Sequence, residues 1–160
     1  INESISDSLK EIPKDIQILW QSGKFYDSEA KSALSEVGDV AVKQSAFITR
    51  MDLAYAVADL VISRAGASSI SELCLLGKPS ILVPSPNVAE DHQTHNAMAL
   101  VKKGAAVMVK DSDAVSKLMS TACDLLRNTD KTALMERNIA ALAKMDAGLT
   151  IAEEVYKIVG

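Results

Sequence analysis

The sequence is poor in aromatic residues and in cysteine. Phe, Trp and Tyr make up 4% of the 160 residues, whereas apolar residues make up 48%. Aliphatic side chains and alanine must therefore fill the core, which suits helices packed on a parallel sheet better than a sandwich with aromatic layers. The two cysteines, Cys74 and Cys123, lie inside expected helices. We expect them to be small buried residues rather than a disulfide.

The sequence also lacks a signal peptide, a long apolar run and an excess of basic residues. No apolar stretch approaches the roughly 20 residues that span a bilayer, so we expect a soluble, cytoplasmic domain. The formal net charge is -4, from 17 basic and 21 acidic residues. No basic stripe indicates a nucleic-acid partner, and the acidic balance argues against binding to anionic lipid. The length fits one domain.

Short apolar runs alternate with helical patterns along the chain. Buried strands are expected at 16–20, within 40–48, and at 60–63, 79–83 and 105–109. Helices are expected at 1–10, 25–37, 50–58, 68–76, 92–103, 113–127, 131–144 and 149–159, with Gly77 and Gly104 as helix stops. This alternation predicts an α/β fold, a doubly wound Rossmann-like parallel sheet with extra C-terminal helices packed outside it.

The loop after the third expected strand is the most informative, because ligands bind beyond the carboxyl ends of strands in such sheets. Gly66 would permit a tight backbone path and close ligand approach, and Ser68 or Ser69 could cap the helix that follows. The amides of that helix's first turn favour an anion such as a diphosphate. Glu72, one turn on, could bind ribose hydroxyls. Alternatively, Ser69 and Glu72 form a capping box, and spacing alone does not decide.

Two further loops end strands at the same edge. After the fourth strand, the next helix opens with an amide- and imidazole-rich cluster in which Gln93 and Asn96 share a face suited to sugar hydroxyls. The alternative is a solvated first turn capped by Asp91. A metal held by His92 and His95 lacks a third ligand, and none is expected. The third loop, at the end of the second expected strand, contains Ile48, which could offer its backbone N–H and C=O groups to a base edge. Alternatively, this strand end simply enters the core.

Together these loops resemble the C-terminal domain of the MurG family of bacterial cell-wall glycosyltransferases. The resemblance rests on the stretch ADLVISRAGASSISELCLLGKPSILVP and on DHQ followed by NA, with matching segments at Gln21–Lys24 and Phe47–Asp59. It covers nearly the whole chain and weakens toward the C-terminus. It implies the donor domain of a GT-B type enzyme that transfers N-acetylglucosamine (GlcNAc) from UDP-GlcNAc to undecaprenyl-pyrophosphoryl-muramoyl-pentapeptide. That reaction belongs to peptidoglycan synthesis, and hence to cell division and cell shape.

The resemblance also implies where each part of UDP-GlcNAc would bind. It assigns uracil to Ile48, the diphosphate to the amides of Ala67, Ser68 and Ser69, ribose to Glu72, and the sugar hydroxyls to Gln93 and Asn96. At His92 the family often has glutamine, so a direct role there is doubtful. We expect transfer without a metal or other cofactor. None of the residues of this chain is expected to be catalytic.

The resemblance further implies that residues 1–160 are a single donor domain. The family's first strand with its Gly-Gly-Ser loop, and the N-terminal acceptor domain, are expected to be missing. The lipid-linked acceptor and peripheral contact with the cytoplasmic face of the bacterial inner membrane would both depend on that missing domain. We therefore expect this chain alone to bind UDP-GlcNAc weakly and to catalyse no turnover.

Three other functions stay open at this point. The chain could be the donor domain of another UDP-sugar glycosyltransferase with the same fold, such as one acting on diacylglycerol or a natural product. It could belong to the epimerase that acts on UDP-GlcNAc at C2, although the acidic and histidine pattern of such an enzyme is not evident. It could also be a non-catalytic nucleotide-sugar-binding module that pairs with a separate acceptor chain.

Overall fold

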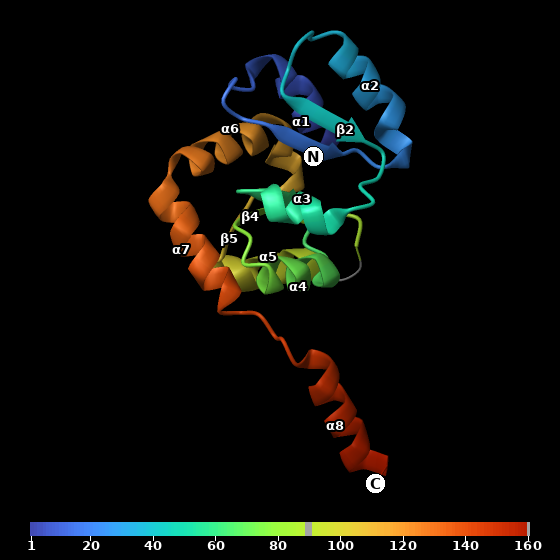
Figure 1. Cartoon of the computed structure of the whole chain (residues 1–160), viewed down its shortest axis with the longest axis vertical. Coiled ribbons are helices and arrows are strands. Elements are labelled where there is room, and N and C mark those ends of the chain that lie inside the picture. The colour runs from blue at the N-terminus through green and yellow to red at the C-terminus, as the bar shows by residue number, and fades with distance from the viewer. Residues whose placement is uncertain (89–90, 160) are drawn as a thin grey trace.

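A computed structural model describes residues 1–88 and 91–159, and it confirms the predicted α/β fold (Figure 1). The strands are β1 Ile18–Gln21, β2 Val42–Ser45, β3 Val61–Ser63, β4 Ser80–Leu82 and β5 Ala106–Met108. The helices are α1 Asn2–Ser8, α2 Asp27–Ser35, α3 Met51–Val57, α4 Ala67–Leu75, α5 His92–Val101, α6 Ala114–Arg127, α7 Thr129–Ala140 and α8 Ala147–Val159. Short 3-10 turns cover Leu9–Glu11, Lys24–Tyr26 and Asp111–Asp113. Every expected strand and helix is present, with ends that shift by up to four residues.

The strands form two parallel sheets instead of the single sheet that the sequence predicts. One sheet contains β1 and β2, and the other has the order β3-β4-β5. A cleft of about 1720 Å³ lies between the two sheets, where Trp20 of β1 and Ile62 of β3 line it together with Met119 of α6. The two sheets are therefore joined by helix packing and not by a shared ladder of backbone hydrogen bonds.

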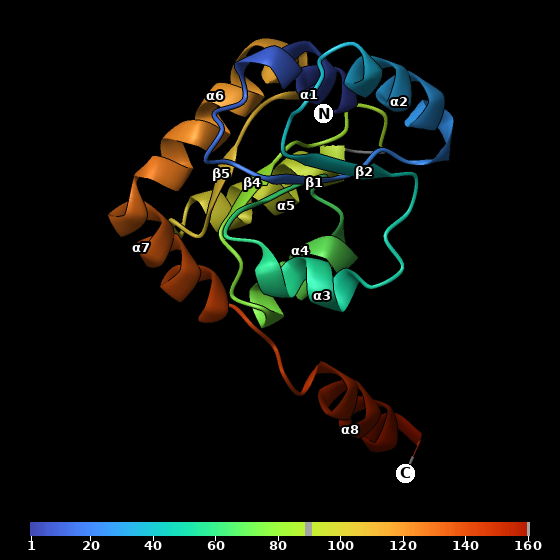
Figure 2. The same ribbon diagram turned by 45° about the horizontal axis from the view of Figure 1, so that its top comes forward.

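Side chains of the central strand alternate between two core clusters, as a strand covered on both faces requires. Ile81 and Val83 pack into a cluster with Leu118 of α6, whereas Leu82 packs into a cluster with Leu73 of α4. A third cluster lies beneath α1 and α2 and contains Ile5, Leu9, Trp20, Ala30 and Met119. Figure 2 shows the corresponding layers, with α1, α2 and α6 on one side of the strands and α3 and α4 on the other.

Both helix stops predicted from glycine are confirmed. Gly77 and Gly104 have φ values of 63° and 63°, in the left-handed region that favours glycine. After α4, the Gly77 amide bonds to the Cys74 carbonyl and the Lys78 amide to the Leu73 carbonyl, which is a Schellman motif. These stops turn the chain sharply back into β4 and β5, so they fix the lengths of the helices that carry the site.

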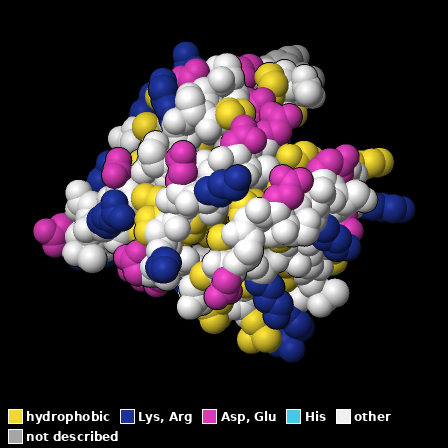
Figure 3. Space-filling model, turned by 90° about the horizontal axis from the view of Figure 1, so that it is seen from above, with side chains coloured by type: hydrophobic (Ala, Val, Ile, Leu, Met, Phe, Trp, Pro, Cys, Tyr) yellow, Lys and Arg dark blue, Asp and Glu magenta, His cyan; other side chains and the backbone are white. Residues whose placement is uncertain are grey.

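The surface of the described residues mixes charge with apolar groups. On the face shown in Figure 3, positive and negative side chains are interspersed, with hydrophobic side chains between them. Helix α8 extends away from the other elements (Figure 1) and has no buried residue. Across the described ranges, no helix combines the length and hydrophobicity that crossing a membrane needs.

The cysteines agree with the sequence-based expectation that they do not pair. Both thiols are free, Cys74 buried in α4 and Cys123 half-buried in α6. Removal from water raises the pKa of each thiol, because burial disfavours the thiolate. Neither is therefore poised for nucleophilic chemistry.

Candidate functional site

The turn between β3 and α4 presents the amides that the sequence assigns to a diphosphate. Helix α4 begins at Ala67. Its first backbone hydrogen bond of the helical type joins the Ile70 amide to the Gly66 carbonyl at 3.0 Å. The amides of Ala67, Ser68 and Ser69 precede that bond, so helix geometry gives them no partner within α4. Three donors at the positive end of a helix dipole form an arrangement suited to an anion.

The predicted capping of this helix by serine is wrong. The N-cap residue is Gly66, and no side chain makes a capping hydrogen bond at the N-terminus of the helix. Because the helix begins at Ala67, both Ser68 and Ser69 already lie within its first turn and cannot occupy the cap position. The φ and ψ of Gly66 are -68° and 148°, which any residue can adopt. Of the two roles expected for this glycine, only close approach by a ligand therefore remains.

The capping-box interpretation of Glu72 is also wrong. Its carboxylate does not turn back to the start of α4; instead Oε2 accepts a hydrogen bond from the Tyr55 hydroxyl of α3 at 3.1 Å. Glu72 lies on an exposed part of α4, one turn after the open amides. The carboxylate is thus available to a ligand that contacts those amides, and its ribose-binding role stays a prediction.

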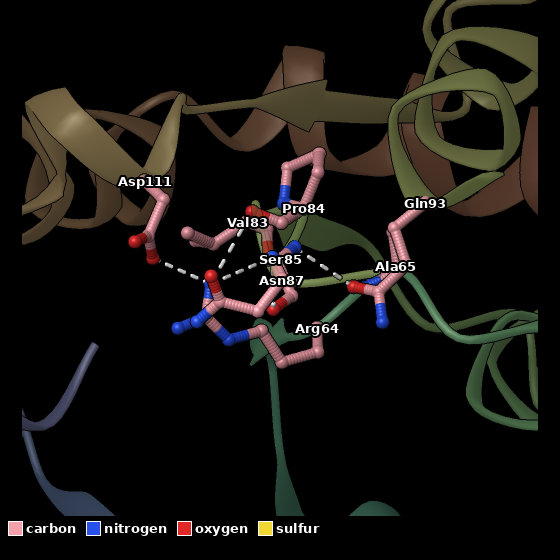
Figure 4. Close-up of polar contacts among 8 residues, drawn as sticks. All are labelled: Arg64, Ala65, Val83, Pro84, Ser85, Asn87, Gln93 and Asp111. Atoms are coloured by element: carbon pink, nitrogen blue, oxygen red, sulfur yellow. Dashed lines mark hydrogen bonds and ion pairs between the residues drawn. The ribbon is translucent and has the colours of Figure 1, made fainter. Parts of the chain in front are cut away.

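Gln93 and Asn96 both reach the turn that precedes α4, as Figure 4 shows for Gln93. The Gln93 Oε1 atom accepts hydrogen bonds from the amides of Ala65 and Ser85, at 3.2 Å and 2.9 Å. Asn96 Nδ2 donates to the Ala65 carbonyl at 3.1 Å. The two side chains therefore join the loops after β3 and β4. Their contacts with sugar hydroxyls stay a prediction.

The predicted capping of α5 by Asp91 is wrong, since that residue adopts a left-handed φ of 53° and makes no side-chain cap bond. The polar loop expected before it includes Ala89 and Glu90, which lie outside the described residues. Where the structure describes the chain, no three His, Cys, Asp or Glu side chains gather closely enough to hold a metal ion. His92 and His95 sit on the exposed first turn of α5.

Arg64 organises the site, and sequence reasoning missed it. Its Nη1 atom lies 3.2 Å and 3.3 Å from the carbonyl oxygens of Val83 and Pro84, and 2.5 Å from Oδ1 of Asp111 (Figure 4). One guanidinium thus connects the carboxyl ends of β3, β4 and β5. An arginine directly after an apolar strand, at a sheet edge where backbone carbonyls converge, is the signal that could have revealed it.

The loop that carries Ile48 opens onto the same cleft as Ser69 and Arg64. One detail of the expectation for Ile48 is wrong, because its amide already donates to Oε1 of Gln21 at 2.8 Å. The amide is therefore not open to a base edge, which leaves the carbonyl and the half-buried side chain. The assignment of Ile48 to uracil stays a prediction with these two groups.

Comparison with known proteins identifies close relatives of this arrangement. The model of the glycosyltransferase family 28 C-terminal domain matches residues 1–151. A UDP-N-acetylglucosamine--N-acetylmuramyl-(pentapeptide) pyrophosphoryl-undecaprenol N-acetylglucosamine transferase of Parabacteroides distasonis is 53% identical over 99% of the chain and 44% of its own length. The Porphyromonas gingivalis protein of the same name is 50% identical over 99% of the chain and 42% of its own length. The chain thus spans less than half the length of these curated relatives.

Solved structures show the same fold. The crystal structure of Acinetobacter baumannii MurG superposes with a TM-score of 0.86 at 27% identity, covering 98% of the chain and 45% of the MurG chain. The glycotransferase of kitacinnamycin superposes with a TM-score of 0.65 at 18% identity, covering 95% of the chain and 38% of its own. The second likeness extends to the fold alone.

Proposed function

The chain belongs to the glycosyltransferase family 28 C-terminal domain family, and on this premise we propose that it is the donor-binding part of a peptidoglycan glycosyltransferase. The donor would be UDP-GlcNAc and the acceptor an undecaprenyl-pyrophosphoryl-muramoyl-pentapeptide, as the names of relatives at 53% and 50% identity state for those proteins. The observation that carries the proposal is the turn between β3 and α4. It combines three first-turn amides with the Glu72 carboxylate one turn away.

These groups suit the chemistry of a nucleoside diphosphate leaving group. When the acceptor hydroxyl attacks C1 of the sugar, the bond to UDP breaks and the diphosphate gains negative charge. Amides of Ala67, Ser68 and Ser69 would stabilise that charge, because they are fixed in direction before the reaction begins. Arg64 and Gln93 support this role indirectly, since they hold the strand ends from which α4 and its neighbouring loops start.

The acceptor and the membrane belong to the remainder of such an enzyme. The relatives are more than twice as long as this chain, which covers 44% and 42% of them. We assign recognition of the lipid-linked sugar, the catalytic base and peripheral contact with the cytoplasmic face of the inner membrane to that other part. A donor domain of this kind binds its nucleotide sugar in a cleft completed by the second domain, so it binds weakly alone.

Titration of the chain with UDP, UDP-GlcNAc and UDP-glucose, followed by NMR shifts of backbone amides, tests the proposal. We expect weak binding of UDP and UDP-GlcNAc, with the largest shifts in residues 66–72, and no transfer to a lipid-linked acceptor. Glu72→Ala should weaken UDP binding about tenfold or more, as expected for loss of hydrogen bonds to a charged group. Glu29→Ala, on exposed α2, is the matched control and should leave binding unchanged.

Three outcomes would contradict this proposal in different ways. Shifts confined to another surface, or no binding of any UDP compound, would overturn the donor site. A preference for UDP-glucose over UDP-GlcNAc would favour a different UDP-sugar transferase of the same fold. Turnover by this chain alone would contradict the assignment of the acceptor site and catalytic base to the other part of the enzyme.

A further inference from the structure

Tyr55 is the one residue of α3 whose side chain reaches the Glu72 carboxylate, by the hydrogen bond of 3.1 Å from its hydroxyl to Oε2. Its ring is half-buried and packs against the core cluster that includes Leu73. Burial, and then the hydrogen bond and charge of Glu72, raise the pKa of this phenol. The hydroxyl therefore keeps its proton at neutral pH and acts as the donor.

The contact restricts a side chain that would otherwise be free to rotate. Glu72 is exposed on α4, and an exposed glutamate samples many rotamers. A carboxylate accepts through two oxygens with about four lone-pair sites. Tyr55 occupies one site on Oε2, so the remaining sites, including all of Oε1, are held in a defined direction.

Helix α3 is itself tied to the end of α4. Lys78 Nζ, just after α4, donates to the Ala58 carbonyl at 2.9 Å and thereby ties the C-terminal end of α3 to α4. At its other end, α3 follows directly from the loop that contains Ile48. The element that orients Glu72 is therefore the one that leads out of the loop assigned to the base.

We infer that Tyr55 is a positioning residue that orients the Glu72 carboxylate toward the ribose hydroxyls of a uridine nucleotide. The inference rests on the proposed function, and it adds a specific source of selectivity for the ribose diol. Tyr55 itself need not touch the ligand. Its contribution is to restrict the orientation of the Glu72 carboxylate before the nucleotide binds, which reduces the conformational entropy lost on binding.

The test compares Tyr55→Phe with the unchanged chain in titrations with UDP and with 2′,3′-dideoxy-UDP. Phe keeps the ring and its packing but removes the hydroxyl. We expect UDP to bind the variant about three- to tenfold more weakly. The lost hydrogen bond is to the charged Glu72, but Tyr55 acts on the ligand only through that carboxylate. The dideoxy compound, which lacks the diol, should bind the two proteins equally.

Tyr156→Phe provides the matched control, because it removes the same hydroxyl from an exposed tyrosine of α8, a helix that extends away from Glu72. It should bind both compounds like the unchanged chain. Equal UDP affinity in Tyr55→Phe would overturn the inference, and so would an equal loss for both compounds, which indicates a merely structural role. If the unchanged chain binds no UDP, the proposed function itself fails; if it does bind UDP and Tyr55→Phe binds equally, only this inference fails.

Discussion

At Gly66, folding and ligand binding place different requirements on the residue. Its backbone angles are open to any residue, and a Cβ built there would meet only Oγ of Ser69, at 3.9 Å. Gly66→Ala should therefore change the free energy of unfolding by less than about 1 kcal/mol, as alanine restricts the unfolded chain but caps a helix less well than glycine. A methyl group beside the open amides should nevertheless weaken UDP binding about tenfold, or 1.4 kcal/mol.

Urea denaturation and UDP titration of the same variant check the two halves of this prediction. An alanine that leaves both stability and affinity unchanged would show that no ligand approaches the backbone at this turn. An alanine that unfolds the domain would show that the conformation of residue 66 is more restricted than its angles indicate. Either result would contradict a glycine kept at the start of α4 for close approach by a ligand.

Single residues also show where sequence reasoning reaches its limit. The glycine stops at Gly77 and Gly104 were predictable, because a left-handed residue is required locally and few residues other than glycine supply it. The partners of Glu72, Gln93 and Arg64 were not, because each bond reaches another loop or helix and depends on how these pack at the sheet edge. A capping box, by contrast, is a local pattern, and here a tertiary contact replaced it.

At the scale of elements, Arg64 is expected to stabilise the domain by joining the ends of three strands. Its ion pair with Asp111 is partly exposed, with side-chain exposures of 41% and 33%, so solvent screens it. A double-mutant cycle with Arg64→Met and Asp111→Asn should give a coupling energy of about 0.5–1 kcal/mol in urea denaturation. The single change Arg64→Met should cost more, because the carbonyls of Val83 and Pro84 also lose a donor.

A second ion pair offers a matched control for this cycle. Nη2 of Arg50 lies 2.7 Å from Oδ2 of Asp52, which is also a close contact, but their side chains are 66% and 63% exposed. Arg50→Met should leave the free energy of unfolding nearly unchanged. Equal losses from Arg64→Met and Arg50→Met would contradict a connecting role for Arg64.

The elements themselves were largely predictable, whereas their grouping into sheets was not. Each of the short apolar runs forms a strand, since period-two and continuous apolar patterns report burial directly. The division between β1-β2 and β3-β4-β5 depends on which strands pair, and pairing partners leave no mark in composition or spacing. The apolar pattern at the C-terminus correctly predicted the helix α8. The helix nevertheless has no buried residue, because an apolar pattern does not show which element the helix packs against.

For the whole molecule, the cleft between β1 and β3 predicts that an added strand stabilises the domain. Edges of two parallel sheets face it, and apolar side chains such as Ile18 and Val61 line it. A strand inserted there would form ladders on both sides and cover these side chains, as the expected first strand of the family would. Extending the chain at its N-terminus with the segment that precedes this domain in full-length relatives should raise Tm and slow amide exchange in β1 and β3.

An extension of equal length made of Gly and Ser is the control for this experiment. Such a segment has low strand propensity and no apolar side chains to bury, so it should leave Tm and exchange rates close to those of the unextended chain. The same gain from both extensions would show that length alone matters. No gain from the natural segment would show that the cleft is not a strand site.

The position of α6 has a consequence for the order of folding. This helix packs Leu118 into the cluster beneath β4 and Met119 into the cluster beneath α1 and β1, so it bridges the two sheets. It spans Ala114–Arg127, late in the sequence. A chain emerging from the ribosome can therefore pair β1 with β2 and β3 with β4 early, whereas β5 and the bridging contacts of α6 are added only after synthesis has passed residue 127. The slow step of co-translational folding should fall at that length.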